Sequence, residues 1–231
     1  MISHVAAALA QMFGRMTVSE TPSLPVVGGT ILAANHTSLA DPVLVVAALR
    51  RLGIDPVIMA TAGLWRVPVL GGALAREGHI PVHRGTARAA SSLADAAEAL
   101  AAGRCVLMYG EGRIPDRRDS GEAAPLPFRS GLARLALATG APVRPVGQAG
   151  ARRVSSGTTA KQLAGVLTAP VRRPRVHVHV GAPLFLPEGL AEATAVAHGA
   201  VTSAWHTAQS GLATIGRPSA DRAQGRQVVG G

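Results

Sequence analysis

A histidine and an aspartate lie five residues apart in a short polar segment between two apolar stretches. The segment, residues 35–41, reads NHTSLAD. We expect it at a strand-to-helix turn, where an open α/β sheet exposes functional groups in a crevice. Asp41 in the first helical turn would orient the His36 imidazole and stabilise the imidazolium that forms on proton uptake, so the spacing predicts a general base. The alternative is an ordinary loop histidine with Asp41 as a helix N-terminal charge.

Two more polar segments follow apolar, strand-like stretches. Residues 109–113 read YGEGR, and the glycines on both sides of Glu111 allow the backbone to turn sharply and approach a ligand. Glu111 would accept a hydrogen bond from a hydroxyl, and Arg113 would hold a phosphate. Residues 78–84 read GHIPVHR and place Arg84 at a strand end. Taken alone, Arg84 would be interpreted as a solvated loop residue, and it becomes a candidate site residue only together with the other segments.

These segments need a scaffold of alternating strands and helices. Apolar runs and turn signals predict strands at 26–34, 56–61, 79–82, 104–109, 142–146 and 175–180. Helical spacing predicts helices at 41–52, 86–102, 130–139 and 190–209, with short helical pieces within 64–75. Residues 147–173 are basic and carry no clear pattern. The order predicts an α/β fold, a largely parallel central sheet of about six or seven strands covered by helices on both faces.

One domain at residues 21–210 accommodates this scaffold. Apolar residues recur at helical spacing from Ile2 to Met16, which predicts an N-terminal amphipathic helix over residues 1–20. That helix would either pack on its own domain or lie in a bilayer interface. The Gly- and Arg-containing tail 211–231 is predicted to be disordered.

The charge of the chain favours acidic partners. Formal net charge is +10, and residues 123–187 hold nine Arg or Lys residues and no Asp or Glu. Nucleic acid, an anionic leaflet, phosphorylated substrates and an acidic carrier protein all fit, as does an Arg-rich composition without a specific partner. An aromatic content of 3% argues against a single-strand nucleic-acid binder. Without a signal-peptide pattern or an apolar run long enough to span a bilayer, we expect a cytoplasmic protein, with peripheral contact at the cytosolic membrane face as an extension.

Other reactive side chains are expected to be structural. Cys105 is the only cysteine, so no intramolecular disulfide or CxxC pair can form. His177 and His179 alternate with valines, which puts both on one face of a strand. A third metal ligand is not evident, so a polar outer face is the prediction and no metal is assigned.

Taken together, the polar segments resemble the blocks of the glycerolipid acyltransferase family typified by 1-acylglycerol-3-phosphate acyltransferases. That family carries NHxxxxD, GxxxxxR, FPEGTRS and a short proline block, in this order. The matching residues here are NHTSLAD, GHIPVHR, the Glu-Gly pair at 111–112 and APVRPV at 141–146. FRSG at 128–131 is similar to the family's F-K-x-G segment, with Arg129 for Lys. Gly110 stands where the family has Pro, and the missing Thr shifts Arg113 by one position.

The resemblance implies an acyltransferase without a cofactor or metal. His36, held by Asp41, would deprotonate an acceptor hydroxyl that attacks the thioester of acyl-CoA or acyl carrier protein, in phospholipid biosynthesis. The acceptor implied is a lysophospholipid, most directly 1-acylglycerol-3-phosphate, and the backbone of residues 110–112 is a candidate oxyanion donor. The substrate-binding positions implied are Asn35, Arg84, Glu111, Gly112, Arg113 and Arg129. Two alternatives remain: a same-fold acyltransferase with a non-phospholipid acceptor, and a non-catalytic protein that binds anionic surfaces or nucleic acid.

Overall fold

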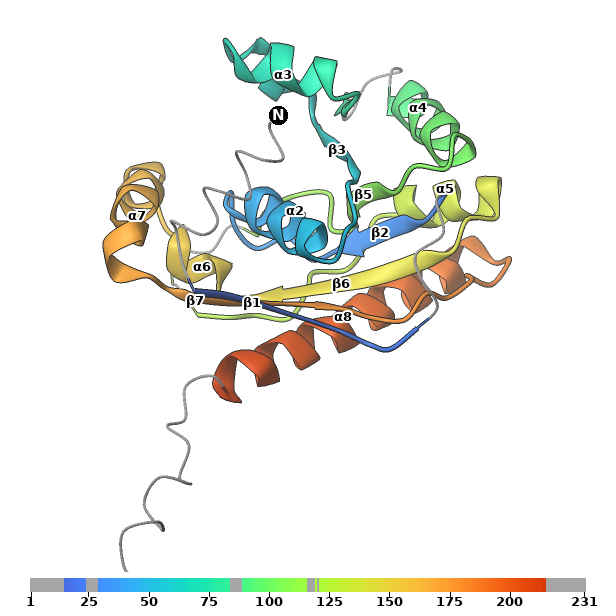
Figure 1. The fold of residues 1–231 in the computed structure, drawn as a ribbon. Coiled ribbons are helices and arrows are strands. Elements are labelled where there is room, and N and C mark those ends of the chain that lie inside the picture. Colours follow the sequence, from blue (N-terminus) through green and yellow to red (C-terminus); the bar gives the residue numbers. More distant parts are fainter. Residues whose placement is uncertain (1–14, 24–28, 84–88, 116–118, 120, 215–231) are drawn as a thin grey trace, which may run out of the picture.

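A seven-stranded sheet forms the centre of the described part of the chain, with helices on both faces (Figure 1). The computed structural model describes residues 15–23, 29–83, 89–115, 119 and 121–214. The strands are β1 (Arg15–Glu20), β2 (Ile31–Ala34), β3 (Val57–Thr61), β4 (Ile80–Val82), β5 (Val106–Tyr109), β6 (Val143–Ala149) and β7 (Arg175–Val180). Their order across the sheet is β1-β7-β6-β2-β5-β3-β4, and β6/β7 is the antiparallel pair. The predicted α/β class with a largely parallel sheet is confirmed.

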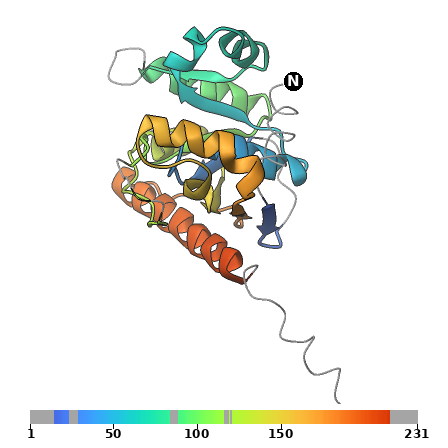
Figure 2. The same ribbon diagram turned by 90° about the vertical axis from the view of Figure 1, so that its left-hand side faces the viewer.

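The helical elements alternate with the strands, as the sequence pattern indicates. They are α2 (Asp41–Arg51), η1 (Ala62–Arg66), α3 (Leu70–Arg76), α4 (Ala89–Ala101), α5 (Gly131–Thr139), α6 (Ala151–Val154), α7 (Thr159–Arg172) and α8 (Leu190–Thr214). In the side view of Figure 2, α8 and α2 lie on opposite sides of the central strands. None of the helices in the described ranges is long and apolar enough to cross a membrane.

Alternating side chains of β2 build the two halves of the core. Leu32 and Ala34 point to the face that α2 covers, and Ile31 and Ala33 point to the face covered by α4, α5 and α8. All four side chains are completely buried. A strand buried on both faces reads as a continuous apolar run, which is how this strand was found in the sequence.

Two helices occupy the stretch for which no element was predicted. α6 is a single turn, and among the described side chains of α7 Ala169 is buried, whereas Leu167 and Val171 are exposed. Pro170 lies inside α7. A proline in a helix interior removes a hydrogen bond and ordinarily signals the end of a helix, so the sequence pattern missed α7.

In the residues that it describes, the structure differs from the elements predicted near both ends of the chain. Arg15–Glu20 is strand β1 and not the end of a helix over residues 1–20, because it pairs in parallel with β7 along its whole length. The predicted helix at residues 1–14 lies outside the described residues. Residues 211–214 continue α8, so the predicted tail begins too early. The remainder, 215–231, also lies outside the described residues.

The two alternating histidines of β7 fasten β1 to the sheet. The Thr17 hydroxyl lies 2.7 Å from His177 Nδ1, and the Ser19 hydroxyl lies 2.9 Å from both His177 Nε2 and His179 Nδ1. Both rings share one face, as predicted, but they are 7% and 8% exposed, so the predicted polar outer face is wrong. Burial lowers the pKa of both histidines, which favours the neutral form of both rings.

Replacing Gly147 with alanine should destabilise the fold. A methyl group at Gly147 would overlap the main chain of Ala204 and Trp205 in α8, which packs directly on β6. Overpacking of this kind costs about 3 kcal/mol when backbone must move. We expect urea unfolding to show this loss for Gly147→Ala. Gly199→Ala in α8 is the matched control, because no atom lies within 4 Å of its added methyl; it should leave stability equal or higher, and a comparable loss there would contradict the packing argument.

Candidate active site

Three parallel strands end side by side at the polar turn that carries His36. The registers pair Ala34 of β2 with Tyr109 of β5 and with Val146 of β6. The turn at residues 35–40, the turn at 110–112 and the end of β6 therefore meet at the carboxyl edge of the sheet. In open α/β folds this edge is where ligands bind.

His36 and Asp41 form the hydrogen-bonded pair that the spacing predicts. His36 Nδ1 lies 2.9 Å from Asp41 Oδ2, with Asp41 fully buried and the His36 side chain 12% exposed. A carboxylate only accepts hydrogen bonds, so Nδ1 carries the proton and Nε2 keeps its lone pair. The arrangement leaves Nε2 as the nitrogen that can take a proton from another molecule.

Further donors hold the Asp41 carboxylate from its own turn and from β6. The backbone N–H groups of Thr37 and Ser38 both donate to Oδ2, the latter at 2.8 Å. Oδ1 accepts from Gln148 Nε2 at 3.0 Å and from the Thr37 hydroxyl at 3.3 Å. These bonds leave the carboxylate one orientation, and it is the orientation that faces the imidazole of His36.

Gln148 is a functional candidate that the sequence reasoning missed. Besides Asp41, its side chain donates to the Thr37 hydroxyl at 2.8 Å, and its main chain is bound by Asn35. The only signal in the sequence was a polar residue at the end of an apolar strand, two positions beyond the APVRPV block. The contact joins residues 107 positions apart, so local pattern could not reveal it.

Asn35, predicted to bind substrate, lies beneath the turn. Its Nδ2 donates to the Gln148 carbonyl at 3.1 Å, and its Oδ1 accepts the Gln148 N–H at 2.8 Å. The side chain is completely buried. The observed bonds hold β2 against β6 at the level of His36.

Glu111 supports the main chain of His36 from the neighbouring strand. Its Oε1 accepts the His36 N–H at 2.7 Å, and the residue is 3% exposed. Its Oε2 is buried without a hydrogen-bond partner in the described ranges. Burial raises the pKa of Glu111 to about 7, against the opposing effect of backbone N–H groups. Glu111 therefore exchanges a proton near neutral pH while it touches the residue that carries the base.

Tyr109 stacks on the imidazole of His36, which the sequence did not predict. The ring centroids are 4.4 Å apart and the planes are inclined by 29°. Its hydroxyl is buried and has no hydrogen-bond partner among the described residues. Burial raises the pKa of Tyr109 well above its ordinary value, so the ring beside His36 stays neutral. The stacking and the bond to Asp41 together fix the plane of the imidazole.

The glycines around Glu111 allow a second segment to cover the turn. A methyl group at Gly110 would overlap the Phe128 ring, so the close approach of Phe128 requires glycine at this position. Gly112 has φ of +67° and lies against the Arg129 side chain, and Arg129 N donates to the Gly110 carbonyl at 2.9 Å. The Gly112 N–H donates to Tyr109 at 3.1 Å, so within the turn only the first two N–H groups remain candidates for an oxyanion.

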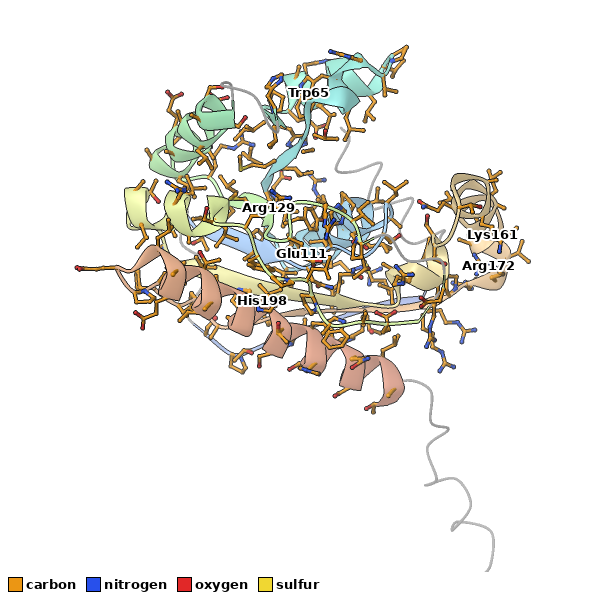
Figure 3. All side chains as sticks on the ribbon, turned by 180° about the vertical axis from the view of Figure 1, so that it is seen from behind. Trp65, Glu111, Arg129, Lys161, Arg172 and His198 are labelled. Atoms are coloured by element: carbon orange, nitrogen blue, oxygen red, sulfur yellow. The ribbon has the colours of Figure 1, made fainter. Side chains whose placement is uncertain are left out.

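The predicted arginines divide into two groups by position. Arg113 and Arg129 are exposed beside the 110–112 turn, and Figure 3 shows Arg129 near Glu111. Arg84 lies outside the described residues. It follows β4, which stands at the far edge of the sheet with β3 and β5 between it and β2. In the described ranges no group of three potential metal ligands occurs.

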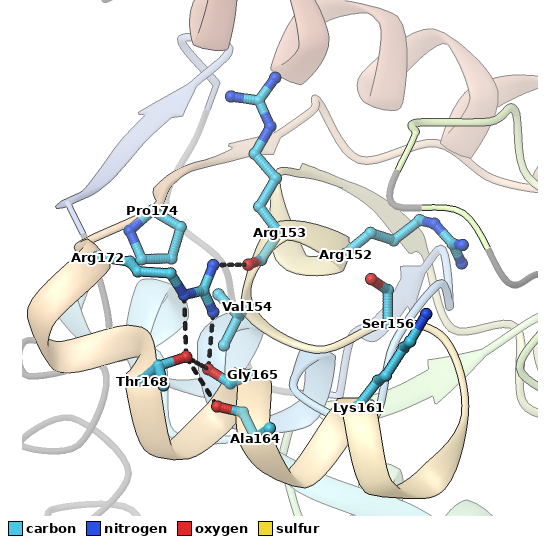
Figure 4. Close-up of a pocket in the computed structure, with 10 residues that line it drawn as sticks. All are labelled: Arg152, Arg153, Val154, Ser156, Lys161, Ala164, Gly165, Thr168, Arg172 and Pro174. Carbon is cyan, nitrogen blue, oxygen red and sulfur yellow. Dashed lines mark hydrogen bonds between the residues drawn. The ribbon is translucent and has the colours of Figure 1, made fainter.

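Helix α6 connects the His36 turn to a basic groove. Arg152, which is buried, donates to the Thr37 carbonyl at 3.2 Å, and the Ser38 hydroxyl donates to the Ser155 carbonyl at 2.8 Å. The groove between α6 and α7 has a volume of about 620 Å³ (Figure 4). Arg172 crosses it to donate to the Arg153 carbonyl at 2.8 Å. Lys161 also lines the groove, so part of the basic stretch gathers beside the turn.

The raised pKa of Glu111 predicts a pH-dependent stability. A folded-state pKa of about 7 above an ordinary 4.5 means that the folded protein keeps a proton that the unfolded chain has lost. The stabilisation is complete below the unfolded value and is lost as pH rises towards 7. Glu111→Gln keeps an acceptor for His36 but cannot ionise. Urea unfolding should show that wild type loses about 3 kcal/mol relative to this variant between about pH 4 and about pH 8. Parallel pH profiles would contradict the assignment.

Comparisons with known proteins bear on the family and the fold of this chain. A family model described as Acyltransferase matches residues 15–148. The crystal structure of the 1-acyl-sn-glycerophosphate (LPA) acyltransferase PlsC from Thermotoga maritima is similar with a TM-score of 0.65 and 17% sequence identity, covering 94% of this chain and 80% of that chain. At this identity the likeness shows a shared fold. No curated protein matches the sequence. Because the family model spans more than half of its length, this chain belongs to the acyltransferase family.

Proposed function

We propose that the protein transfers a fatty acyl group from acyl-CoA or acyl carrier protein to a hydroxyl of a lysophospholipid, most directly 1-acylglycerol-3-phosphate. The observation that carries the proposal is the His36–Asp41 pair at the carboxyl edge of the sheet, with Nε2 of His36 left as the base. Family membership implies an acyl donor and a lipid acceptor. PlsC, which shares the fold, is named for the acylation of 1-acyl-sn-glycerophosphate.

The pair performs the reaction in two proton transfers. Nε2 of His36 takes the proton of the acceptor hydroxyl as that oxygen attacks the thioester carbonyl, and Asp41 stabilises the imidazolium. The tetrahedral intermediate carries its negative charge on the former carbonyl oxygen, for which the N–H groups of Gly110 and Glu111 are the candidate donors. Collapse of the intermediate expels the thiolate, which takes the proton back from His36. The ester forms without an acyl-enzyme.

Two basic surfaces flank this centre and suit the charged ends of the substrates. Arg113 and Arg129, exposed on one side, would bind the phosphate of the acceptor through charge-assisted hydrogen bonds. The α6–α7 groove with Lys161, on the other side, would meet the phosphates of acyl-CoA or the acidic surface of a carrier protein. Arg84 remains a predicted acceptor contact.

A second candidate acceptor follows from the shifted arginine. The chain has EGR at 111–113 where related sequences have EGTR, so Arg113 leaves the turn one position early. A hydroxyl lipid without a phosphate would not need this arginine. A non-catalytic anion-binding protein is the remaining alternative. Anion binding, however, does not require a buried, hydrogen-bonded Asp41 beside His36.

Loss of the base should abolish transfer. Thiol release from acyl-CoA and acyl carrier protein, measured with 1-acylglycerol-3-phosphate, should fall about a hundredfold or more in His36→Ala. Asp41→Asn should also slow release strongly, because the ring loses its orientation. His206→Ala on exposed α8 surface is the control and should match wild type. Release that persists in His36→Ala would refute the base, and release only with another hydroxyl lipid would refute the acceptor.

Arg129 distinguishes the two acceptor classes. Arg129→Gln should raise KM for 1-acylglycerol-3-phosphate about tenfold, the loss expected for one hydrogen bond to a charged group. KM for a monoacylglycerol, which lacks phosphate, should stay unchanged. Arg134→Gln in α5 provides a control at another exposed arginine. An equal rise for both acceptors would show that Arg129 does not read the phosphate.

A further inference from the structure

The segment that follows β3 holds apolar side chains in solvent. Leu64, Val67 and Val69 are 36%, 44% and 88% exposed, and the Trp65 ring between them is half-buried. We call residues 64–69 the apolar tip. Figure 3 shows Trp65 at the end of the molecule, well apart from Glu111 beside the sheet. Single exposed apolar residues are ordinary, but several in one short segment indicate an interaction surface.

The backbone of the tip is strained in a way that presents Val69. Its φ is +67° and its ψ is −51°, and the Leu70 N–H donates to the Pro68 carbonyl at 2.7 Å to close a three-residue turn. A β-branched residue rarely adopts a positive φ, and strain of this kind collects at functional sites. Gly71 has no room for a methyl group against the Trp65 main chain. The tip is thus a tightly packed turn, and its shape keeps the valine outside.

The charges around the tip fit an anionic, partly apolar surface. From residue 56 to residue 76 the chain has no Asp or Glu, whereas Arg66 and Arg76 are both exposed. Tryptophan and arginine at the border of an apolar surface are typical of the water–lipid interface of membranes. The α6–α7 groove carries more positive charge than the tip and would suit an acidic carrier protein better. The apolar side chains of the tip therefore favour a lipid surface as its partner.

The tip lies on the edge of the sheet where the proposed base lies. η1 begins directly after the carboxyl end of β3, and β2, β5 and β3 run in parallel, so the tip and the 35–40 turn both follow the carboxyl ends of parallel strands. In that turn Leu39 is 62% exposed. A surface that held the tip would therefore be approached by the edge that carries His36.

We propose that the apolar tip inserts into the headgroup region of an anionic bilayer and docks the carboxyl edge of the sheet on the membrane. Val67 and Val69 enter the interface, Trp65 lies at its border, and Arg66 and Arg76 contact lipid phosphates. The proposal concerns binding in the absence of substrate, so it can fail while the catalytic proposal holds, and the reverse.

Vesicle binding by the full chain tests the tip. Sedimentation with phosphatidylcholine vesicles containing phosphatidylglycerol should show about a tenfold weaker partition for Val67→Ser/Val69→Ser, since two buried apolar side chains are lost. Arg66→Gln and Arg76→Gln should each weaken it about fivefold, and only on anionic vesicles. The matched control is Leu167→Ser/Val171→Ser on α7, whose side chains are 70% and 88% exposed; it should bind as wild type does.

Two further measurements separate the tip from other anchors and from misfolding. Val69→Gly relieves the positive φ, so it should unfold at the same temperature as wild type or higher and still bind vesicles less. Brominated lipids should quench Trp65 fluorescence, and Trp65→Phe should remove the quenching because Trp205 is buried. Any of three outcomes would overturn the proposal and point to another anchor or to a protein partner. These are undiminished vesicle binding by the valine variants, quenching that Trp65→Phe does not affect, and a loss of binding only in the α7 control.

Discussion

The buried carboxylate of Asp41 is the constraint on which the rest of the site depends. Burying a charge is unfavourable unless hydrogen bonds replace the lost water, and Asp41 is completely inaccessible. Its donors come from the His36 ring, from Thr37 and Ser38 in the turn, and from Gln148 in β6. Movement of any of them leaves a buried charge short of a partner, so the turn, α2 and β6 must share one arrangement.

The strands on either side of β2 hold different members of the pair. β6 supplies Gln148, which fixes Asp41, whereas β5 leads into Tyr109 and Glu111, which hold the ring and the main chain of His36. The distance between base and carboxylate therefore reflects the register of three strands as well as the five-residue spacing in the turn. An apolar sheet interior, which does not rearrange easily, thus sets the geometry of a polar site.

Much of the fold and the centre of the site could be predicted because their signals are local. The apolar run of β2, the polar turn and the apolar start of α2 follow one another in sequence, so His36 and Asp41 could be placed within reach. Gln148 and Tyr109 could not be assigned, because their roles come from strand neighbours that are distant in sequence. α7 was missed because Pro170 lies inside it and signals a helix end, and β1 was missed because the apolar residues up to Met16 recur at helical spacing.

The edge position of β1 has a consequence for the order in which the protein assembles during synthesis. β1 pairs with β7, and Thr17 meets His177 across 160 positions of sequence. A ribosome releases the partner of this strand only when most of the domain has emerged, so β1 waits unpaired while β2 to β6 form around it. During that interval its exposed backbone is open to pairing with other chains. Its hydroxyl-rich face, with Thr17 and Ser19, limits how well it can pair with strands that lack the histidines of β7.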